Sequence, residues 1–190
     1  MAERGCRPSG RLLHASDLHL ESLGDKSCDD FMFMVHAAKH TKADIVIIAG
    51  DLFDSQRVKD NLIDLVIGEL RHLESHVVIL PGNHDCLTTA SAYRRSAIWE
   101  DCPNITILKS PNGEILRLLD LGITLWGKPL TSYEEDNAPL EGIPRPENNG
   151  TWNVAVAHGF YIGNDEPYAP SYQITHREIV ESGWDYIALG

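Results

Sequence analysis

The sequence lacks the features that mark a disulfide scaffold, a zinc ribbon or a membrane protein. Its four cysteines, Cys6, Cys28, Cys86 and Cys102, are scattered, and no two of them form a C-x-x-C pair. Scattered single thiols are typical of a reducing compartment. No apolar run approaches the ~20 residues of a membrane-spanning helix, and residues 1–16 contain no apolar stretch long enough for a signal peptide. These absences predict a cytoplasmic protein without a membrane partner.

Basic residues are also scarce. The chain has 16 Lys and Arg against 28 Asp and Glu, which gives a formal net charge of −12 with histidine neutral. An acidic protein does not attract nucleic acid through its overall field, so a nucleic-acid ligand would need a local positive site, such as bound metal ions or a basic partner. A length of 190 residues with 43% hydrophobic residues is sufficient for a globular core. We therefore expect a single domain over residues 1–190.

In the first half of the chain, the spacing of apolar residues alternates between strand-like and helix-like. Strands are expected at residues 12–15, 44–49 and 77–80. Helices are expected at residues 31–39, 58–73 and 90–99. Asp29 or Asp30 could cap the first of these helices. This order of elements predicts a parallel sheet with right-handed crossover connections.

The second half has a different pattern. Short strands separated by turn residues are expected at residues 105–109, 115–119 and 123–126, which favours a meander or hairpin. Residues 131–150 lack periodicity and predict a long loop, and such loops are commonly functional or mobile. A strand is expected at 154–157, a helix at 175–182 with a capping box of Thr175 and Glu178, and a last strand at 186–189.

Residues able to bind a metal follow four of the expected strands. They are Asp17 and His19, then Asp51 and Asp54, then Asn83, His84 and Asp85, and finally His158. In α/β sheets, ligands bind at the carboxyl ends of the strands, so these side chains should meet at one edge. Carboxylate, imidazole and amide groups without thiolate favour Mn²⁺, Fe or Zn²⁺ over Ca²⁺ or a structural zinc. A shared carboxylate can also bridge two ions, as in two-metal hydrolytic sites.

Four short motifs resemble those of the calcineurin-like metallophosphoesterases. They are DLH (17–19), GDLFD (50–54), GNHD (82–85) and AHG (157–159), and they occur in this order. The resemblance runs from Asp17 to the last residue. It implies an α/β fold built as a two-sheet β sandwich flanked by helices, with a dinuclear metal centre at one edge. It also implies metal-dependent hydrolysis of phosphoester bonds.

The resemblance implies a role for each metal-binding position. Asp17 and His19 would bind the first ion, and Asn83 and His158 would bind the second. Asp51 would bridge both. The implied cofactors are two divalent ions, with Mn²⁺ favoured and Fe or Zn²⁺ as alternatives.

The same resemblance makes His84 a catalytic residue that protonates the leaving oxygen or stabilises the transition state. Asp85 would orient the ring of His84. Asp54 is left between two interpretations, a cap of the following helix or a contact behind the metal ligands. Gly50 and Gly82 are expected to serve tight turns rather than to contact the site.

One motif of the family is missing. Its members have a Gly-His-x-His block after a late strand, whereas DYIALG (185–190) supplies a strand and a glycine at the end of this sequence. Each ion would then have three protein ligands, so we expect weak or incomplete metal loading. We also expect the C-terminal strands of the second sheet to be lacking, in either a fragment or a shortened relative.

The motifs also bear on the substrate. Ser55 after Asp54, and GNHD in place of GNHE, count against a protein phosphatase. SDLHL (16–20) together with GDLFD is similar to the SbcD-type DNA repair exonucleases. A phosphodiesterase or nuclease is therefore the leading hypothesis, with a phosphoester substrate that could be a nucleic acid. A catalytically impaired module that binds a partner subunit and a small-molecule phosphatase remain alternatives, and the oligomeric state is open.

Overall fold

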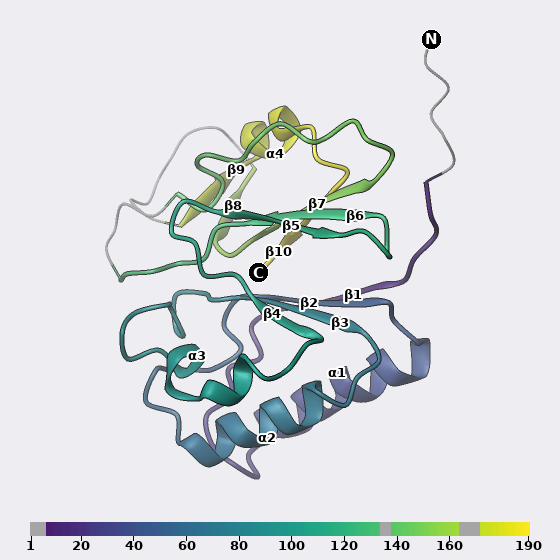
Figure 1. Ribbon diagram of the computed structural model, residues 1–190. Coiled ribbons are helices and arrows are strands. Elements are labelled where there is room, and N and C mark those ends of the chain that lie inside the picture. Colours follow the sequence, from purple (N-terminus) through teal and green to yellow (C-terminus); the bar gives the residue numbers. More distant parts are fainter. Residues whose placement is uncertain (1–6, 134–137, 164–171) are drawn as a thin grey trace.

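The computed structural model describes residues 7–133, 138–163 and 172–190. Two four-stranded sheets lie face to face, with helices on their outer sides (Figure 1). The helices are α1 (Lys26–Thr41), α2 (Asp60–Leu70), α3 (Ala92–Arg95) and α4 (His176–Ser182), with a 3₁₀ turn, η1, at Ala97–Trp99. The strands are β1 (Leu12–Ala15), β2 (Ile45–Ala49), β3 (His76–Leu80), β4 (Ile105–Ile107), β5 (Glu114–Leu118), β6 (Ile123–Gly127), β7 (Trp152–Ala157), β8 (Phe160–Ile162), β9 (Gln173–Thr175) and β10 (Tyr186–Leu189). The architecture confirms the expected α/β sandwich.

The first sheet has the order β1-β2-β3-β4, and all of its strands are parallel. The second has the order β10-β7-β6-β5, in which only the β5–β6 hairpin is antiparallel. The predicted meander of residues 105–126 is wrong in one respect. β4 joins the first sheet, where Ile105 pairs with Val77, because Ile105 and Ile107 are buried in the core beneath the helices. β8 and β9, which form a separate two-stranded sheet, were not predicted.

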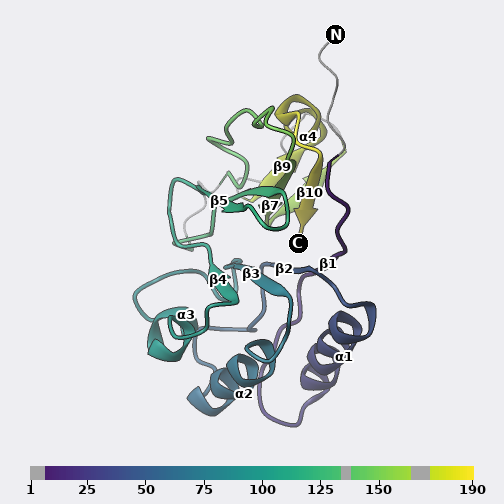
Figure 2. The same ribbon diagram turned by 45° about the vertical axis from the view of Figure 1, so that its right-hand side comes forward.

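Three apolar layers hold the elements together. The largest packs α1 and α2 against the first sheet, as Figure 2 shows. A second layer lies between the two sheets and contains Ile47 of β2, Leu125 of β6 and Val156 of β7. The third covers the outer face of the second sheet and includes Trp184, which follows α4. Every residue of β2 is buried, as expected for a strand covered on both faces.

The helix boundaries differ from those expected. α1 begins at Lys26 because the side chain of Asp25, rather than Asp29 or Asp30, caps it and accepts a hydrogen bond from the backbone N–H of Cys28 at 3.2 Å. The helix expected at residues 90–99 is divided into α3 and η1. The capping box of Thr175 and Glu178 at α4 is confirmed. Among the described residues, none of the helices has the length and apolar character needed to cross a membrane.

Candidate metal centre

The loops after β1 and β2 have an unusual backbone where the predicted ligands lie. Asp17, His19 and Asp51 have φ angles of 53°, 46° and 51°. Among the described residues they are three of the five non-glycine residues with positive φ, a conformation that side chains disfavour. Backbone hydrogen bonds from Asp17 to Gly50 (3.2 Å) and from His19 to Asp51 (3.0 Å) join the two loops. Local strain of this kind is typical of ligand-binding sites.

Ligand atoms of Asp17, Asp51 and His158 lie within 4.8 Å of one another. Nδ1 of His158 is 3.0 Å from the carbonyl oxygen of Ala49, which can only accept, so this nitrogen carries a proton whether the ring is neutral or charged. Nε2 lies 3.2 Å from Oδ2 of Asp51 and 2.7 Å from Oδ1 of Asn83, and in the neutral ring it presents a lone pair to a metal ion at this position. Three electron-rich atoms converging on one point are the arrangement that a cation requires.

Asp51 and His158 are both buried, with 2% and 4% of their surfaces exposed. Without a cation, they interact as an ion pair. Burial raises the pKa of Asp51, but the hydrogen bond and the charge of His158 outweigh it, and the pKa lies below its usual value. Burial correspondingly lowers the pKa of His158, but Asp51 outweighs it and the pKa is raised. A divalent ion would replace the proton that this pair shares.

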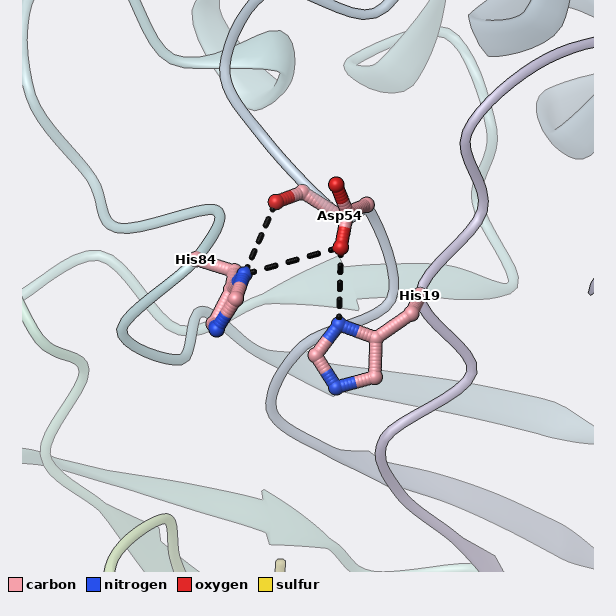
Figure 3. A group of neighbouring side chains, drawn as sticks. All are labelled: His19, Asp54 and His84. Atoms are coloured by element: carbon pink, nitrogen blue, oxygen red, sulfur yellow. Dashed lines mark hydrogen bonds and ion pairs between the residues drawn. The ribbon is translucent and has the colours of Figure 1, made fainter.

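Asp54 lies between two imidazoles (Figure 3). Its Oδ1 is 3.3 Å from Nδ1 of His19 and 3.7 Å from Nδ1 of His84, and its backbone carbonyl is 2.9 Å from the same nitrogen of His84. The two rings are 4.7 Å apart and nearly perpendicular. Nε2 of His19 lies 3.9 Å from both Oδ1 of Asp17 and Oδ2 of Asp51. His19 therefore turns one nitrogen toward the other candidate ligands and the other toward Asp54.

These contacts decide between the two interpretations of Asp54. It does not cap the following helix, because the N-cap of α2 is Lys59. It occupies the position expected of Asp85, since it is the carboxylate beside the ring of His84. A carboxylate behind an imidazole ligand fixes its tautomer and orientation.

Asp85 is fully buried, and its oxygens point elsewhere. Oδ1 accepts a hydrogen bond from the backbone N–H of Gly82 at 2.7 Å. Oδ2 accepts from the backbone N–H of Phe53 at 3.1 Å and from the hydroxyl of Tyr93 at 2.5 Å. Asp85 was expected to orient the ring of His84, but its described hydrogen bonds go to other groups. They join the loop after β3 to the loop after β2.

Gly50 and Gly82 contact the site more closely than expected. A Cβ on Gly50 would lie 2.1 Å from Nδ1 of His158, and Gly50 also has a φ of +91°. A Cβ on Gly82 would lie 2.1 Å from Oδ1 of Asp51. Gly50 has the positive φ that glycine tolerates best, and both glycines leave room for the candidate ligands.

The candidate ligands open into one hollow of about 460 Å³. Its lining residues are Asp17, His19, Asp51, Asn83, His84, His158, Gly159, Phe160, Tyr172 and Gly190. All five predicted metal ligands and His84 are in this set, whereas Asp85 lies behind it. Phe160 and Tyr172 were not predicted from the sequence, although Phe160 directly follows His158 and Gly159.

The family model for calcineurin-like phosphoesterases matches residues 10–190. The chain belongs to this family. Two curated relatives are a metallophosphoesterase of Bacillus subtilis, YhaO, described as uncharacterized, and the DNA double-strand break repair protein Mre11 of Methanopyrus kandleri. The chain is 27% identical to the first over 94% of its own length and 47% of that protein, and 23% identical to the second over 95% and 44%. It therefore spans about half the length of the curated relatives it matches.

The donor set of this calcineurin-like phosphoesterase fits divalent metal ions. It consists of carboxylates, imidazoles and one amide oxygen, which are the ligands of Mn²⁺, Fe and Zn²⁺ sites. His19 and His158 each have one ring nitrogen fixed by an oxygen acceptor, which prepares the other as a ligand. Family membership and this geometry together support the binding of divalent metal ions at this site.

Proposed function

We propose that the chain hydrolyses phosphodiester bonds with two divalent ions, Mn²⁺ being favoured. The observation that supports this most directly is the position of Asp51. Its Oδ2 faces Nε2 of His158 at 3.2 Å and Nε2 of His19 at 3.9 Å, so one carboxylate oxygen lies between two groups of ligands. That is the position of a bridging ligand.

In this proposal, Asp17, His19 and Asp51 hold one ion, and Asp51, Asn83 and His158 hold the other. Bound divalent ions would polarise a phosphoryl oxygen and lower the pKa of water. Asp51 is prevented from turning away because its other oxygen accepts the backbone N–H of His84 at 2.9 Å. The protein's contribution is to hold these side chains before substrate arrives.

His84 is the proposed general acid. Its Nδ1 faces the backbone carbonyl of Asp54, which can only accept a hydrogen bond, so Nδ1 is the donor. Nε2 lies on the far side of the ring in Figure 3, and in the doubly protonated ring it would carry the second proton, which it would donate to the leaving oxygen. Proton donation at that oxygen contributes about 10²–10⁴-fold in typical enzymes.

The lining of the hollow favours a diester over a monoester. Among the described residues that line it, none is Lys or Arg, so bound metal and the histidines would have to offset the charge of a phosphate. A diester has one negative charge and a monoester close to two, and the diester therefore needs less compensation. The likeness to Mre11 supports a nucleic acid as one such diester, and the scattered cysteines support a cytoplasmic location.

The test measures hydrolysis of bis(p-nitrophenyl) phosphate and p-nitrophenyl phosphate with added Mn²⁺. The chain is compared with His84→Ala and with a control, His36→Ala, in which an exposed histidine on α1 is removed outside the hollow. We expect turnover of the diester that requires Mn²⁺. His84→Ala should lower kcat about 10²–10⁴-fold, and His36→Ala should match the parent.

Two outcomes would contradict the proposal. Turnover of the monoester alone would indicate a small-molecule phosphatase. Binding of Mn²⁺ without turnover of either ester would indicate a module that binds a partner rather than an enzyme.

A further inference from the structure

The loop after β2 and the loop after β3 are joined through one buried carboxylate. Asp85 accepts three hydrogen bonds, two from backbone N–H groups and one from the hydroxyl of Tyr93. The backbone donors belong to Phe53 in the first loop and Gly82 in the second. A buried carboxylate is unfavourable unless its oxygens are hydrogen-bonded. The position of Asp85 therefore depends on all three donors.

Tyr93 is the side-chain donor in this group, and its ring is held on both sides. It belongs to α3 and is only 2% exposed. Its ring centroid lies 5.8 Å from that of Phe53 and 5.8 Å from that of Trp99. The backbone N–H of Tyr93 donates to the side chain of Ser91 at 3.3 Å. The hydroxyl is thus presented to Asp85 from a packed aromatic cluster.

The two joined loops also contain the candidate ligands. Asp51 lies two residues before Phe53, and Asn83 directly follows Gly82. A shift of Asp85 would move these loops relative to each other, and with them the oxygens that face Nε2 of His158. The hydroxyl of Tyr93 is outside the hollow, so it can influence the ligands only through the carboxylate.

We propose that Tyr93 is a positioning residue, which through Asp85 holds Asn83 and His84 in register with Asp51. This inference rests on the proposed function of the site, because it assumes that these residues bind metal. Groups hydrogen-bonded directly to metal ligands typically change metal affinity 10–100-fold when they are disrupted. Tyr93 acts one contact further out, so we expect an effect at or below the lower end of that range.

The test is Tyr93→Phe, which keeps the aromatic ring and removes one oxygen. Tyr186→Phe is the matched control, because the hydroxyl of Tyr186 contacts Nδ1 of His14 at 3.1 Å, away from the hollow. Calorimetry with Mn²⁺ should show a weaker affinity for Tyr93→Phe, by up to about 10-fold, and an unchanged affinity for Tyr186→Phe. Urea denaturation of both variants in the presence of EDTA measures their stability without metal. A loss of stability is thereby separated from a loss of metal binding.

Asp85→Asn and the double variant Tyr93→Phe/Asp85→Asn distinguish positioning from general packing. If Tyr93 acts through Asp85, the affinity loss of the double variant should be smaller than the sum of the two single losses. A merely structural role would lower stability in EDTA and leave Mn²⁺ affinity intact at temperatures where the variants are folded.

The outcomes separate this inference from the proposed function. Parent chain that binds Mn²⁺ and hydrolyses the diester, together with Tyr93→Phe of equal affinity, would overturn the inference alone. Additive losses in the double variant would overturn it as well. A folded parent chain that binds no Mn²⁺ would overturn the proposed function and this inference with it.

Discussion

Replacement of Gly50 by alanine should damage the fold and the candidate metal centre together. The structure allows the magnitude to be estimated from two separate terms. A φ of +91° is a left-handed conformation, which costs a residue with a Cβ about 1–2 kcal/mol. The added methyl would lie 2.1 Å from Nδ1 and 2.3 Å from Cγ of His158, and overpacking of this kind costs about 1–3 kcal/mol.

We therefore expect Gly50→Ala to lower the free energy of unfolding by about 2–5 kcal/mol. Gly24→Ala is the matched control, because Gly24 has a similar φ of +82° but nothing within 4 Å of the added Cβ. It should lose only the conformational term, about 1–2 kcal/mol. Urea denaturation in EDTA measures both values, and their difference isolates the contact with His158.

The same pair of variants tests the site. Displacement of His158 should weaken Mn²⁺ binding in Gly50→Ala, whereas Gly24→Ala should bind as the parent does. Equal losses of stability in the two variants, with Mn²⁺ affinity unchanged in both, would show that His158 can move aside freely, and the reasoning from close packing would be refuted.

Three further predictions follow from the same contacts. Asp54→Ala should weaken Mn²⁺ binding about 10–100-fold in calorimetry, because His19 loses the carboxylate that orients it; an unchanged affinity would contradict this role. Burial lowers the pKa of His76, so this side chain binds a proton more tightly in the unfolded chain than in the folded one. The free energy of unfolding should therefore decline as the pH falls through about 6.5. Urea denaturation at pH 5.5 and 7.5 in EDTA should show a smaller decline in His76→Gln, and equal declines would count against this assignment. Mn²⁺ at 100 times its Kd should raise the free energy of unfolding by about 2.7 kcal/mol. The measurement is a rise in Tm that EDTA reverses. An unchanged Tm would mean that Mn²⁺ does not bind the folded chain more tightly than the unfolded chain.

The sequence predicted most of the strands, and the structure places the candidate metal ligands around one hollow. Parallel strands of one sheet end at a common edge, which brings Asp17 and Asp51 together, and His158 joins them when the second sheet packs on the first. The roles assigned to the site residues remain predictions. The carboxylate partner of His84 could not be identified in this way, because Asp54 and Asp85 are both aspartates in loops that follow strands. Which carboxylate faces the ring depends on loop backbone geometry, including the left-handed turn at Asp51.

The sheet to which a strand belongs and the bounds of the helices were predicted less well where the spacing of apolar residues is not distinctive. The strand at residues 105–107 has the same apolar character as its neighbours in sequence, and only tertiary packing assigns it to the first sheet. Similarly, residues 90–99 have helical spacing over too short a span to specify one continuous helix. α1 began earlier than expected because Asp25 supplies a cap before its periodic residues start.

The hydrogen bond between His158 and the carbonyl of Ala49 joins residues that are 109 positions apart in the sequence. It connects the end of β2, in the first sheet, to the residue that follows β7, in the second. The candidate site is thus formed only when the two halves of the sandwich have docked. A metal ion bound there would stabilise the docked arrangement by mass action, because the site exists in the folded chain and not in the unfolded one. Substitutions that loosen the apolar layer between the sheets, however far from the hollow, should therefore weaken metal binding. Metal affinity would then report how completely the two sheets are assembled.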